Sequence, residues 1–280
     1  MAGFFNIISA RIGSFVNGNV HFYYFVNTMP IKGLINIPYI NDIPPMQLQY
    51  IGRNENEIEK SLNKYKNMAK SIDAFLGLNK TFCETVKRLY CIDVPYGYFA
   101  SFHPWFESPY TKRDEIVYLD NSAKIPYGFS EHLTFLDMIR KVSGIKTLFV
   151  SRKFSKEAMD IRNKTRLLVD IKSYDTYDFA SKHGILMNTK NFNQAHMALP
   201  RKLLMYLMCG MKVLTDNSWT ECINFMIENG TNPYIYKDVN DINYMHEHDF
   251  GIINPRSFCL EERVKSLGEQ LTSLAKIAGH

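Results

Sequence analysis

The stretch that decides the fold runs from residue 180 to residue 216 and reads ASKHGILMNTKNFNQAHMALPRKLLMYLMCGMKVLTD. The apolar runs at 185–188 and 212–215 predict two strands. Between them, apolar residues recur at helical spacing over 199–209, and Gly210 follows as a stop signal. Pro200 suits the first turn of this helix, because its missing N–H would have no partner there in any case. The stretch therefore predicts a strand, a loop, a helix and a second strand.

The same alternation extends back to residue 115. The pattern predicts further strands at 115–119, 146–150 and 166–171, and helices at 128–142, 156–164 and 174–182. Five strands that alternate with helices, without a long hairpin signal, are typical of a parallel sheet covered on both faces. We therefore expect a Rossmann-like domain over residues 111–259.

Residues 1–110 are less regular but contain both kinds of element. The patterns predict strands at 20–26, 34–37, 47–51 and 96–102, and helices at 55–72 and 80–91. They indicate a smaller α/β domain, with residues 104–113, rich in aromatics and Pro, as the linker. Residues 260–280 have helical spacing over most of their length and are expected to pack back on this first domain. The expected fold class is α/β, with two domains and a returning helix at the end of the chain.

Composition excludes several classes of protein. The 280 residues are enough for one large or two small domains with a real core. The net charge of +5 is spread along the chain, which argues against a nucleic-acid partner. Five scattered cysteines fit neither a disulfide framework nor a metal knuckle. The first residues do not resemble a secretory signal, and no apolar run is long enough for a membrane span. We expect a soluble, cytoplasmic protein.

Two basic residues, Arg201 and Lys202, stand in the first turn of the helix after Pro200. Free backbone N–H groups and the positive end of the helix dipole favour an anion at this place, and a diphosphate would suit it. Basic side chains are locally unfavourable there, which indicates a ligand. The alternative is that both residues form the solvated face of an amphipathic helix whose core residues include Leu203 and Leu207.

The string at 200–216, followed by ECINFMIENG at 221–230, resembles the nucleotide-sugar-binding half of GT-B glycosyltransferases. The resemblance covers about residues 115–255 and implies two Rossmann-like domains, with the donor bound in the second and the acceptor in the first. One position departs from the family pattern, because Met205 stands where a Glu usually binds the ribose hydroxyls, and a thioether is a weak acceptor. Either Glu221 or Asp216 takes the ribose, or the nucleotide sits differently, or the domain binds none.

By length and small first domain, the chain also resembles the compact capsid-glycan xylosyltransferases of chloroviruses, which are large algal viruses. This resemblance implies UDP-xylose as donor, an oligosaccharide or glycoprotein as acceptor, and the host cytoplasm as location. The expected transfer is inverting and needs no metal cofactor. The sequence lacks the Asp-x-Asp signature of GT-A enzymes, and the His246-Glu-His248 group lacks a matched third ligand.

The donor site is expected to include residues that follow predicted strands. Lys124 and Arg152 come after the first two strands, at the carboxyl ends where parallel sheets bind ligands. With Arg201, Lys202 and Glu221, they make up the predicted donor-binding set. Each of Lys124 and Arg152 alone is equally well explained as an ordinary surface residue.

An inverting transfer also needs a base near the acceptor hydroxyl. The candidates in the first half are His21, Asp73, Asp93 and His103, and Asp73 ranks first because it stands at an element boundary. A helix cap is the alternative for Asp73. His103 and Trp105 are the predicted acceptor-binding residues, with packing between domains as their alternative.

Two other classes of function stay open at this point. A nucleic-acid-interacting protein, or a glycosyltransferase acting on modified bases, would show a steep loss of affinity with added salt. A non-catalytic Rossmann-like partner protein is the other, and Met205 is the residue that keeps it open.

Overall fold

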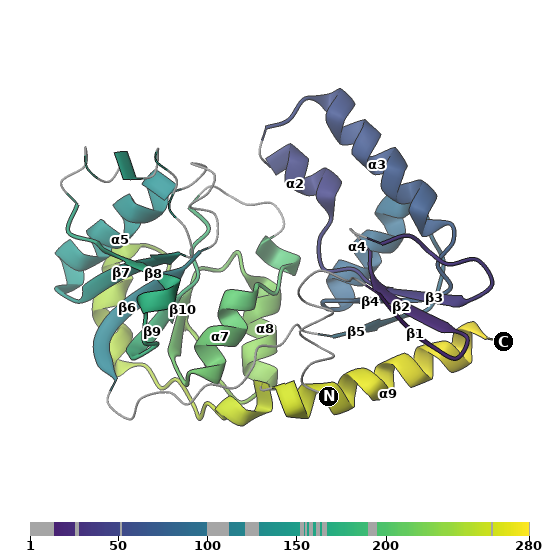
Figure 1. Cartoon of the computed structure of the whole chain (residues 1–280). Coiled ribbons are helices and arrows are strands. Elements are labelled where there is room, and N and C mark those ends of the chain that lie inside the picture. Colours follow the sequence, from purple (N-terminus) through teal and green to yellow (C-terminus); the bar gives the residue numbers. More distant parts are fainter. Residues whose placement is uncertain are drawn as a thin grey trace. The chain divides into compact units, whose positions relative to one another are not determined.

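The computed structural model describes residues 14–25, 28–50, 52–99, 112–120, 129–151, 154, 156, 159–160, 163, 167–189, 195–258 and 260–279. The chain divides into two compact units. Unit 1 comprises residues 1–101 with 263–280, and unit 2 comprises residues 102–262. Each unit is built around its own sheet, and Figure 1 labels the elements.

The sheet of unit 1 has five strands in the order β1-β2-β3-β4-β5. The strands are β1 (Ser14–Asn17), β2 (Val20–Tyr24), β3 (Ile35–Tyr39), β4 (Phe75–Gly77) and β5 (Tyr96–Tyr98). β1 pairs antiparallel with β2 through a tight turn at Gly18, whose positive φ of 59° suits glycine. All the other pairs are parallel.

Three helices connect these strands: α2 (Pro44–Tyr50), α3 (Glu55–Ala69) and α4 (Lys80–Tyr90). The Oδ1 atom of Asn54 accepts the N–H of Glu57 (3.0 Å), and that of Asn79 accepts the N–H of Phe82 (2.8 Å). Both asparagines therefore cap the starts of α3 and α4 and fix where these helices begin.

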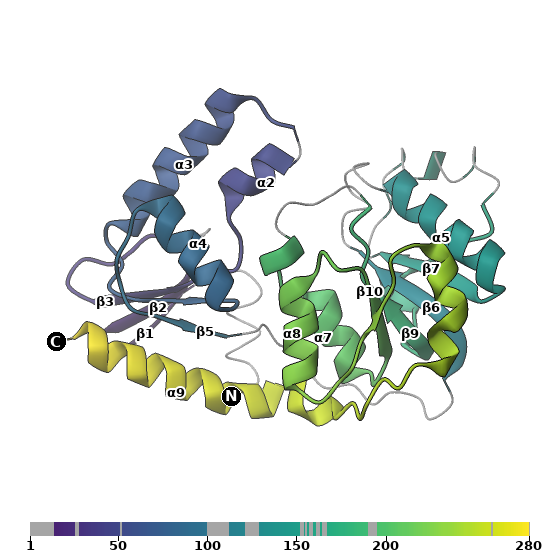
Figure 2. The ribbon, with the colours of Figure 1, turned by 180° about the vertical axis from the view of Figure 1, so that it is seen from behind.

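The last helix of the chain, α9 (Leu260–Ala278), packs on the sheet of unit 1 (Figures 1 and 2). Leu267 and Leu274 of this helix are buried. The side-chain oxygen of Gln270 occupies the space that a Cβ at Gly97 of β5 would need. Helix and strand can approach this closely because Gly97 has no side chain.

The sheet of unit 2 has six strands, all parallel, in the order β11-β10-β9-β6-β7-β8. The strands are β6 (Arg113–Leu119), β7 (Lys146–Ser151), β8 (Asp170–Ser173), β9 (Ser181–Ile185), β10 (Lys212–Thr215) and β11 (Tyr234–Ile235). Numbered within the unit, their order is that of the doubly wound nucleotide-binding fold.

Helices cover both faces of this sheet. They are α5 (Phe129–Ser143), α7 (Arg201–Met208) and α8 (Thr220–Glu228), with the 3₁₀ segments η2 (Tyr174–Thr176), η3 (Ala195–Met197), η4 (Val239–Glu247) and η5 (Pro255–Phe258). α5 and η4 lie on one face and α7 and α8 on the other (Figures 1 and 2). α7 is buried along almost its whole length, from Leu203 to Met208, so only its first turn is available to a ligand.

Several predicted elements are wrong, for local reasons. Residues 47–51 were predicted as a strand, but α2 occupies this region because its two prolines suit a first helical turn. The predicted helix at 174–182 is a single 3₁₀ turn, since Phe179 has a positive φ of 51° and β9 begins two residues later. β4 went unpredicted because three residues are too short to show a pattern. None of the described helices is both long and apolar enough to cross a lipid bilayer.

Candidate functional site

The strands β6 and β9 are neighbours in the middle of the sheet of unit 2, and the chain leaves them toward opposite sides. From β6 it continues to β7, and from β9 it continues to β10, which lies on the other side. In a doubly wound sheet, the loops at the carboxyl ends diverge at this point and leave a crevice in which ligands bind. The ends of β6 and β9, at Leu119 and Ile185, therefore mark the expected site.

Tyr206 of α7 ties these two strand ends together. The backbone N–H of Leu119 donates to its hydroxyl (2.9 Å), and the hydroxyl donates to the carbonyl of Ile185 (3.3 Å). The Tyr206 ring is fully buried against Gly184, where any Cβ would overlap it. Because α7 is anchored in this way, its first turn is held at the crevice.

A polar cluster joins the starts of α7 and α5 at the end of β6. The Lys202 Nζ atom donates a hydrogen bond to the Tyr118 hydroxyl (2.8 Å) and lies 4.0 Å from the centre of the Tyr118 ring. The same hydroxyl is 3.3 Å from Nε2 of His132. His132 Nδ1 is in turn 3.8 Å from Oδ2 of Asp120. We call these four residues the Lys202 cluster.

The positive charge of the Lys202 ammonium is not balanced by a carboxylate of the described residues within ion-pair distance. Burial lowers its pKa, and the carboxylate of Asp120 works in the opposite direction without lying within ion-pair distance. No ion pair among the described residues includes Lys202. Burial raises the pKa of the neighbouring Cys222 thiol, so this group stays neutral beside the lysine. A bound anion would therefore be stabilised by Lys202.

The start of α7 adds a second attraction for an anion. Its N-cap is Pro200, which makes no side-chain cap, and its first turn contains no acidic residue. Backbone N–H groups and the positive end of the helix dipole at such a start favour negative charge. Arg201, the first residue of the helix, is exposed to solvent. The predicted pair Arg201 and Lys202 thus lies at the crevice, with only Lys202 held in place by contacts that the structure shows.

Asp216 orders the loops at the neighbouring strand ends. Its carboxylate accepts the N–H of Asn188 (3.0 Å) after β9 and the N–H of Ser218 (2.8 Å) after β10. It also accepts the hydroxyl of Ser218. Because its carboxylate accepts these hydrogen bonds, Asp216 fixes the loop that leads from β10 toward α8.

Glu221 and Met205, the positions discussed for the ribose, differ in their surroundings. Glu221 is partly exposed in the first turn of α8. Its neighbour Cys222 donates to the carbonyl of Ala198 (3.2 Å), which packs the start of α8 against the segment before α7. Met205 is buried, and the hydroxyl of Tyr174 donates to its sulfur (3.3 Å). Met205 therefore has a packing role within unit 2.

The remaining predicted site residues fall into two groups. Lys124, Arg152, His103 and Trp105 lie outside the described residues. Asp73 is described and precedes β4 in unit 1, at the amino ends of the strands. Its carboxylate accepts the N–H of Asn36 (2.7 Å), and its own N–H donates to the carbonyl of Asn36 (3.0 Å). Asp73 therefore fixes the start of β4 beside β3, and its role as a base stays a prediction.

The other candidate bases of unit 1 have partners of their own. His21 is fully buried, with Nδ1 3.0 Å from Oδ1 of Asn36, as a core histidine would be. Asp93 is exposed and pairs with Lys87 at 2.7 Å. These contacts do not mark His21 or Asp93 as a catalytic base.

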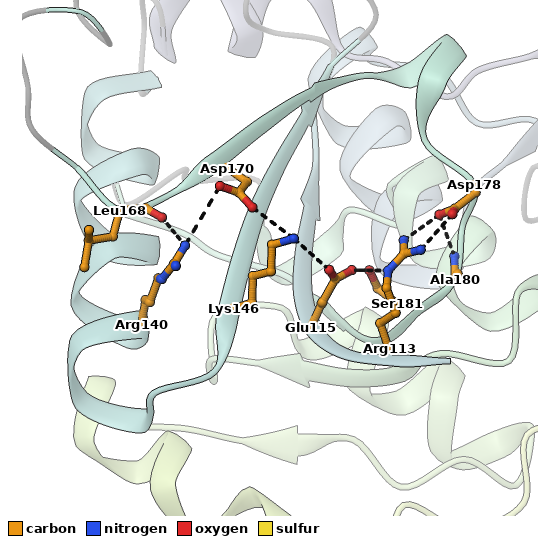
Figure 3. A network of polar contacts seen from close by, with 9 residues as sticks. All are labelled: Arg113, Glu115, Arg140, Lys146, Leu168, Asp170, Asp178, Ala180 and Ser181. Carbon is orange, nitrogen blue, oxygen red and sulfur yellow. Dashed lines mark hydrogen bonds and ion pairs between the residues drawn. The ribbon is translucent and has the colours of Figure 1, made fainter. Parts of the chain in front are cut away.

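Figure 3 shows a different arrangement at the opposite edge of the sheet of unit 2, where the strands begin. The first residues of four neighbouring strands take part: Arg113, Lys146, Asp170 and Ser181. Glu115 is buried and lies 2.9 Å from Arg113, 3.1 Å from Lys146 and 3.0 Å from the Ser181 hydroxyl. Arg113 also binds Asp178 through two hydrogen bonds, of 2.8 and 2.6 Å. In this network, the positive and negative side chains at the amino edge of the sheet are paired with one another.

No group of three or more His, Cys, Asp or Glu side chains in the described part of the chain is arranged to hold a metal ion. The sequence predicts Lys202 as a site residue, which stays a prediction, whereas Tyr118, His132 and Tyr206 were not predicted. Their positions were a possible signal, because Tyr118 precedes the last residue of β6 and His132 lies in the first turn of the next helix. Gly184 lies inside β9 but one residue before the strand predicted at 185–188, so its close packing against Tyr206 followed only from the observed bounds of β9.

Comparisons with known proteins address the fold. No protein-family profile and no curated protein sequence matches the chain. Among solved structures, it is similar to sucrose-phosphate synthase from Thermosynechococcus elongatus, with a TM-score of 0.61, 12% identity, and coverage of 86% of this chain and 68% of that one. It is also similar to S. aureus TarM in a complex that contains UDP, with a TM-score of 0.58, 12% identity, and coverage of 87% and 51%.

A third similar structure is WaaG, a glycosyltransferase involved in lipopolysaccharide biosynthesis, with a TM-score of 0.52, 11% identity, and coverage of 99% and 75%. The chain spans about half the length of TarM. These likenesses confirm the predicted fold class, α/β with GT-B architecture.

Proposed function

We propose that the chain is a glycosyltransferase whose donor is a uridine diphosphate sugar, bound at the carboxyl edge of the sheet of unit 2. The observation that carries the proposal is the Lys202 ammonium, held on Tyr118 between the starts of α5 and α7. A diphosphate supplies the negative charge that this ammonium and the start of α7 attract. UDP, the nucleotide in the TarM complex, contains such a group.

The proposed reaction breaks the bond between the anomeric carbon of the sugar and an oxygen of the diphosphate. The oxygen of an acceptor hydroxyl forms the new bond to the anomeric carbon, and its proton passes to a base. Negative charge develops on the leaving diphosphate. Lys202 and the N–H groups at the start of α7 would stabilise this charge. Residues already fixed in place lose little freedom when they do so. Arg201 is exposed, and its guanidinium would contribute positive charge at the same place.

Donor sugar, stereochemistry and metal requirement are finer parts of the same proposal. We propose UDP-xylose as donor, inversion at the anomeric carbon, a glycan hydroxyl as acceptor, and no metal requirement. Turnover with UDP-xylose, UDP-glucose and UDP-N-acetylglucosamine identifies the donor. Proton NMR of the first product gives the anomeric configuration, and turnover in excess EDTA tests the need for a metal.

The decisive experiment measures UDP binding to the whole chain by calorimetry and by thermal shift. A ligand present at 100 times its dissociation constant stabilises the folded state by about 2.7 kcal/mol. Lys202→Met should weaken UDP binding by about 10- to 100-fold, the worth of a charged hydrogen bond. Lys212→Met is the matched control, because Lys212 begins a strand of the same sheet and lies 4.9 Å from the ring centre of Phe250.

Two results would contradict this proposal. One is the absence of any shift with UDP or UDP-sugars in the wild-type chain. The other is an equal loss of UDP affinity in Lys202→Met and Lys212→Met, which would mean that the two ammonium groups act only through the overall charge.

A second function is favoured by one observation. Met205 is buried against Tyr174 at the position where the family usually has a Glu for the ribose. A non-catalytic partner protein would tolerate this change. It would bind UDP weakly or not at all and would neither hydrolyse nor transfer sugar from any of the three donors.

A further inference from the structure

A cavity of about 600 Å³ lies beside α5, over the carboxyl ends of β9, β10 and β11. Its lining residues come from α5, from the loop after β9 and from the ends of β10 and β11. The Lys202 cluster lies over the end of the neighbouring strand β6. None of the cluster's four residues lines the cavity. The two places are therefore separate parts of one sheet edge, and their chemistry can be compared.

One part of the cavity wall is aromatic. The rings of Phe135 and Tyr236 both line the cavity, with their centres 5.8 Å apart. The hydroxyl of Tyr236 donates to the carbonyl of Leu186 (2.8 Å), which fixes this ring at the end of β9. Such fixed aromatic surface suits the apolar C–H face of a sugar ring or another compact, partly apolar ligand.

The rest of the wall is rich in uncharged polar groups. Ser130 and Thr134 come from one side of α5, and Asn188 and Thr189 come from the loop after β9. The hydroxyl of Thr189 is buried and has no hydrogen-bond partner among the described residues. A buried hydroxyl without a partner is unfavourable, so a ligand that bonds to it would be stabilised. Hydroxyls and amides of this kind bond both as donors and as acceptors.

The charges on the wall argue against an anionic ligand. Glu131 and Asp216 contribute two carboxylates, against the single ammonium of Lys237. Asp216 is further fixed by the N–H groups of Asn188 and Ser218. This balance is the opposite of that in the Lys202 cluster, where a cation lacks an ion-pair partner among the described residues. A phosphate would therefore favour Lys202, while a neutral ligand with many hydroxyls fits the cavity.

We propose that this cavity binds a neutral saccharide of one or two rings. Pockets for small ligands commonly measure about 300–1,000 Å³, and the cavity falls within that range. The proposal is independent of the donor assignment, since it rests on the lining of the cavity alone. If the chain is a transferase, this saccharide would bind in the half expected to hold the donor, and not in residues 1–110, where the acceptor is expected.

The test measures binding of methyl β-D-glucopyranoside to the whole chain by saturation-transfer NMR, without any nucleotide. Thr134→Trp fills the cavity from the exposed side of α5 and should weaken binding by at least about tenfold. Val142→Trp is the matched control. Val142 is also an exposed residue of α5 but does not line the cavity, so this variant should bind as the wild type does. Circular dichroism and melting temperature check that both variants fold.

A charged analogue tests the selectivity. Methyl β-D-glucuronide differs from the neutral probe by one carboxylate and should bind more weakly, because Glu131 and Asp216 repel it. Glu131→Gln should reduce this difference. Binding of the neutral probe that Thr134→Trp leaves unchanged would overturn the proposal, as would the absence of binding. Weaker UDP binding in Thr134→Trp, without weaker glycoside binding, would assign the cavity to the nucleoside instead.

Discussion

The two edges of the sheet of unit 2 differ in how their charges are balanced. At the amino edge, Glu115 lies within 3.1 Å of both Arg113 and Lys146, and further carboxylates flank these cations. At the carboxyl edge, Lys202 donates to the hydroxyl of Tyr118 and belongs to no ion pair among the described residues. The same strands thus begin in a matched network and end beside an uncompensated cation.

The pKa values follow this difference. Burial works to raise the pKa of Glu115, but hydrogen bonds from Arg113, Lys146 and Ser181 outweigh it and hold this pKa below its ordinary value. The folded state therefore favours the charge. At the carboxyl edge, burial lowers the pKa of Lys202, so the folded state disfavours the charge. A charged group that lowers the stability of the folded state is typical of a functional site, whereas a network of paired charges is typical of a structural one.

The largest expected effect comes from breaking the amino edge. Glu115→Ala leaves Arg113 and Lys146 close together without their shared carboxylate. Removing one partner of a buried ion pair costs about 3–5 kcal/mol. Because Arg113 and Lys146 are 39% and 43% exposed and keep Asp178 and Asp170 as partners, the cost lies at the lower end, at about 3 kcal/mol. We expect the free energy of unfolding in urea to fall by this amount, while UDP affinity at a temperature where the variant is folded does not change.

Two controls sharpen this experiment. Glu115→Gln keeps the shape of the side chain and an acceptor for the Ser181 hydroxyl, so it should lose less stability than Glu115→Ala. Lys202→Met, at the other edge, should keep the stability of the wild type or exceed it, because it removes a half-buried charge that has no ion-pair partner among the described residues. The contrast between the edges would be wrong if Lys202→Met lost as much stability as Glu115→Ala.

A second effect is expected from pH. His183 of β9 is buried near the amino edge, and this burial lowers its pKa to about 4. Asp114 works against the shift, while Lys212, Lys182 and His246 add to it. The unfolded state takes up a proton below about pH 6.5 and the folded state only near pH 4, so stability is full above pH 6.5 and falls below it. The loss approaches about 3 kcal/mol at pH 4.

Urea unfolding at pH 7, 5.5 and 4.5 measures this loss. His183→Leu cannot titrate and should show a flatter dependence over the same window. An equal slope in the wild type and in this variant would assign the pH dependence to other groups.

Much of the fold could be predicted because its signals are local. In unit 2, β6, β7 and β10 coincide with the apolar runs predicted at 115–119, 146–150 and 212–215, and α7 shows helical spacing with Pro200 at its start and Gly210 after its end. β8 and β9 are polar in sequence, and each begins four residues from its predicted start. Lys202 was predicted as a site residue from a local signal as well, since a lysine in a first helical turn is locally unfavourable. The wrong elements, such as the predicted strand at 47–51, are short apolar runs whose pattern fits helix and strand equally.

The rest of the site depends on contacts between distant residues, which no local pattern contains. Tyr118 and Lys202 are 84 positions apart, and Leu119 and Tyr206 are 87 apart. The ion network at the amino edge is equally hidden, because Glu115 looks like one polar residue in a strand until its neighbours β7 and β9 are in place. Only the strand order brings these groups together.

A smaller effect is expected from the tyrosine that joins β6 to β9. Tyr206→Phe removes the acceptor of the buried Leu119 N–H, and an unsatisfied buried donor costs about 1–3 kcal/mol. Tyr236→Phe is the control at the same edge, because the hydroxyl of Tyr236 only donates to a carbonyl. We expect Tyr206→Phe to lower the urea midpoint further than Tyr236→Phe and to weaken UDP binding. Equal midpoints would mean that the anchor of α7 lies elsewhere.

The smallest effect is expected at the exposed rim of the amino edge. Asp178 binds Arg113 through two hydrogen bonds, but its side chain is 54% exposed, whereas that of Glu115 is 4% exposed. A hydrogen bond from Arg113 lowers the pKa of Asp178 to about 2, so its contribution is present above pH 3.8 and is lost toward pH 2. Because water screens the pair, Asp178→Asn should cost less than about 1 kcal/mol at pH 7 in urea unfolding. A loss as large as that of Glu115→Ala would show that the network acts as one unit, with its exposed rim as important as its buried centre.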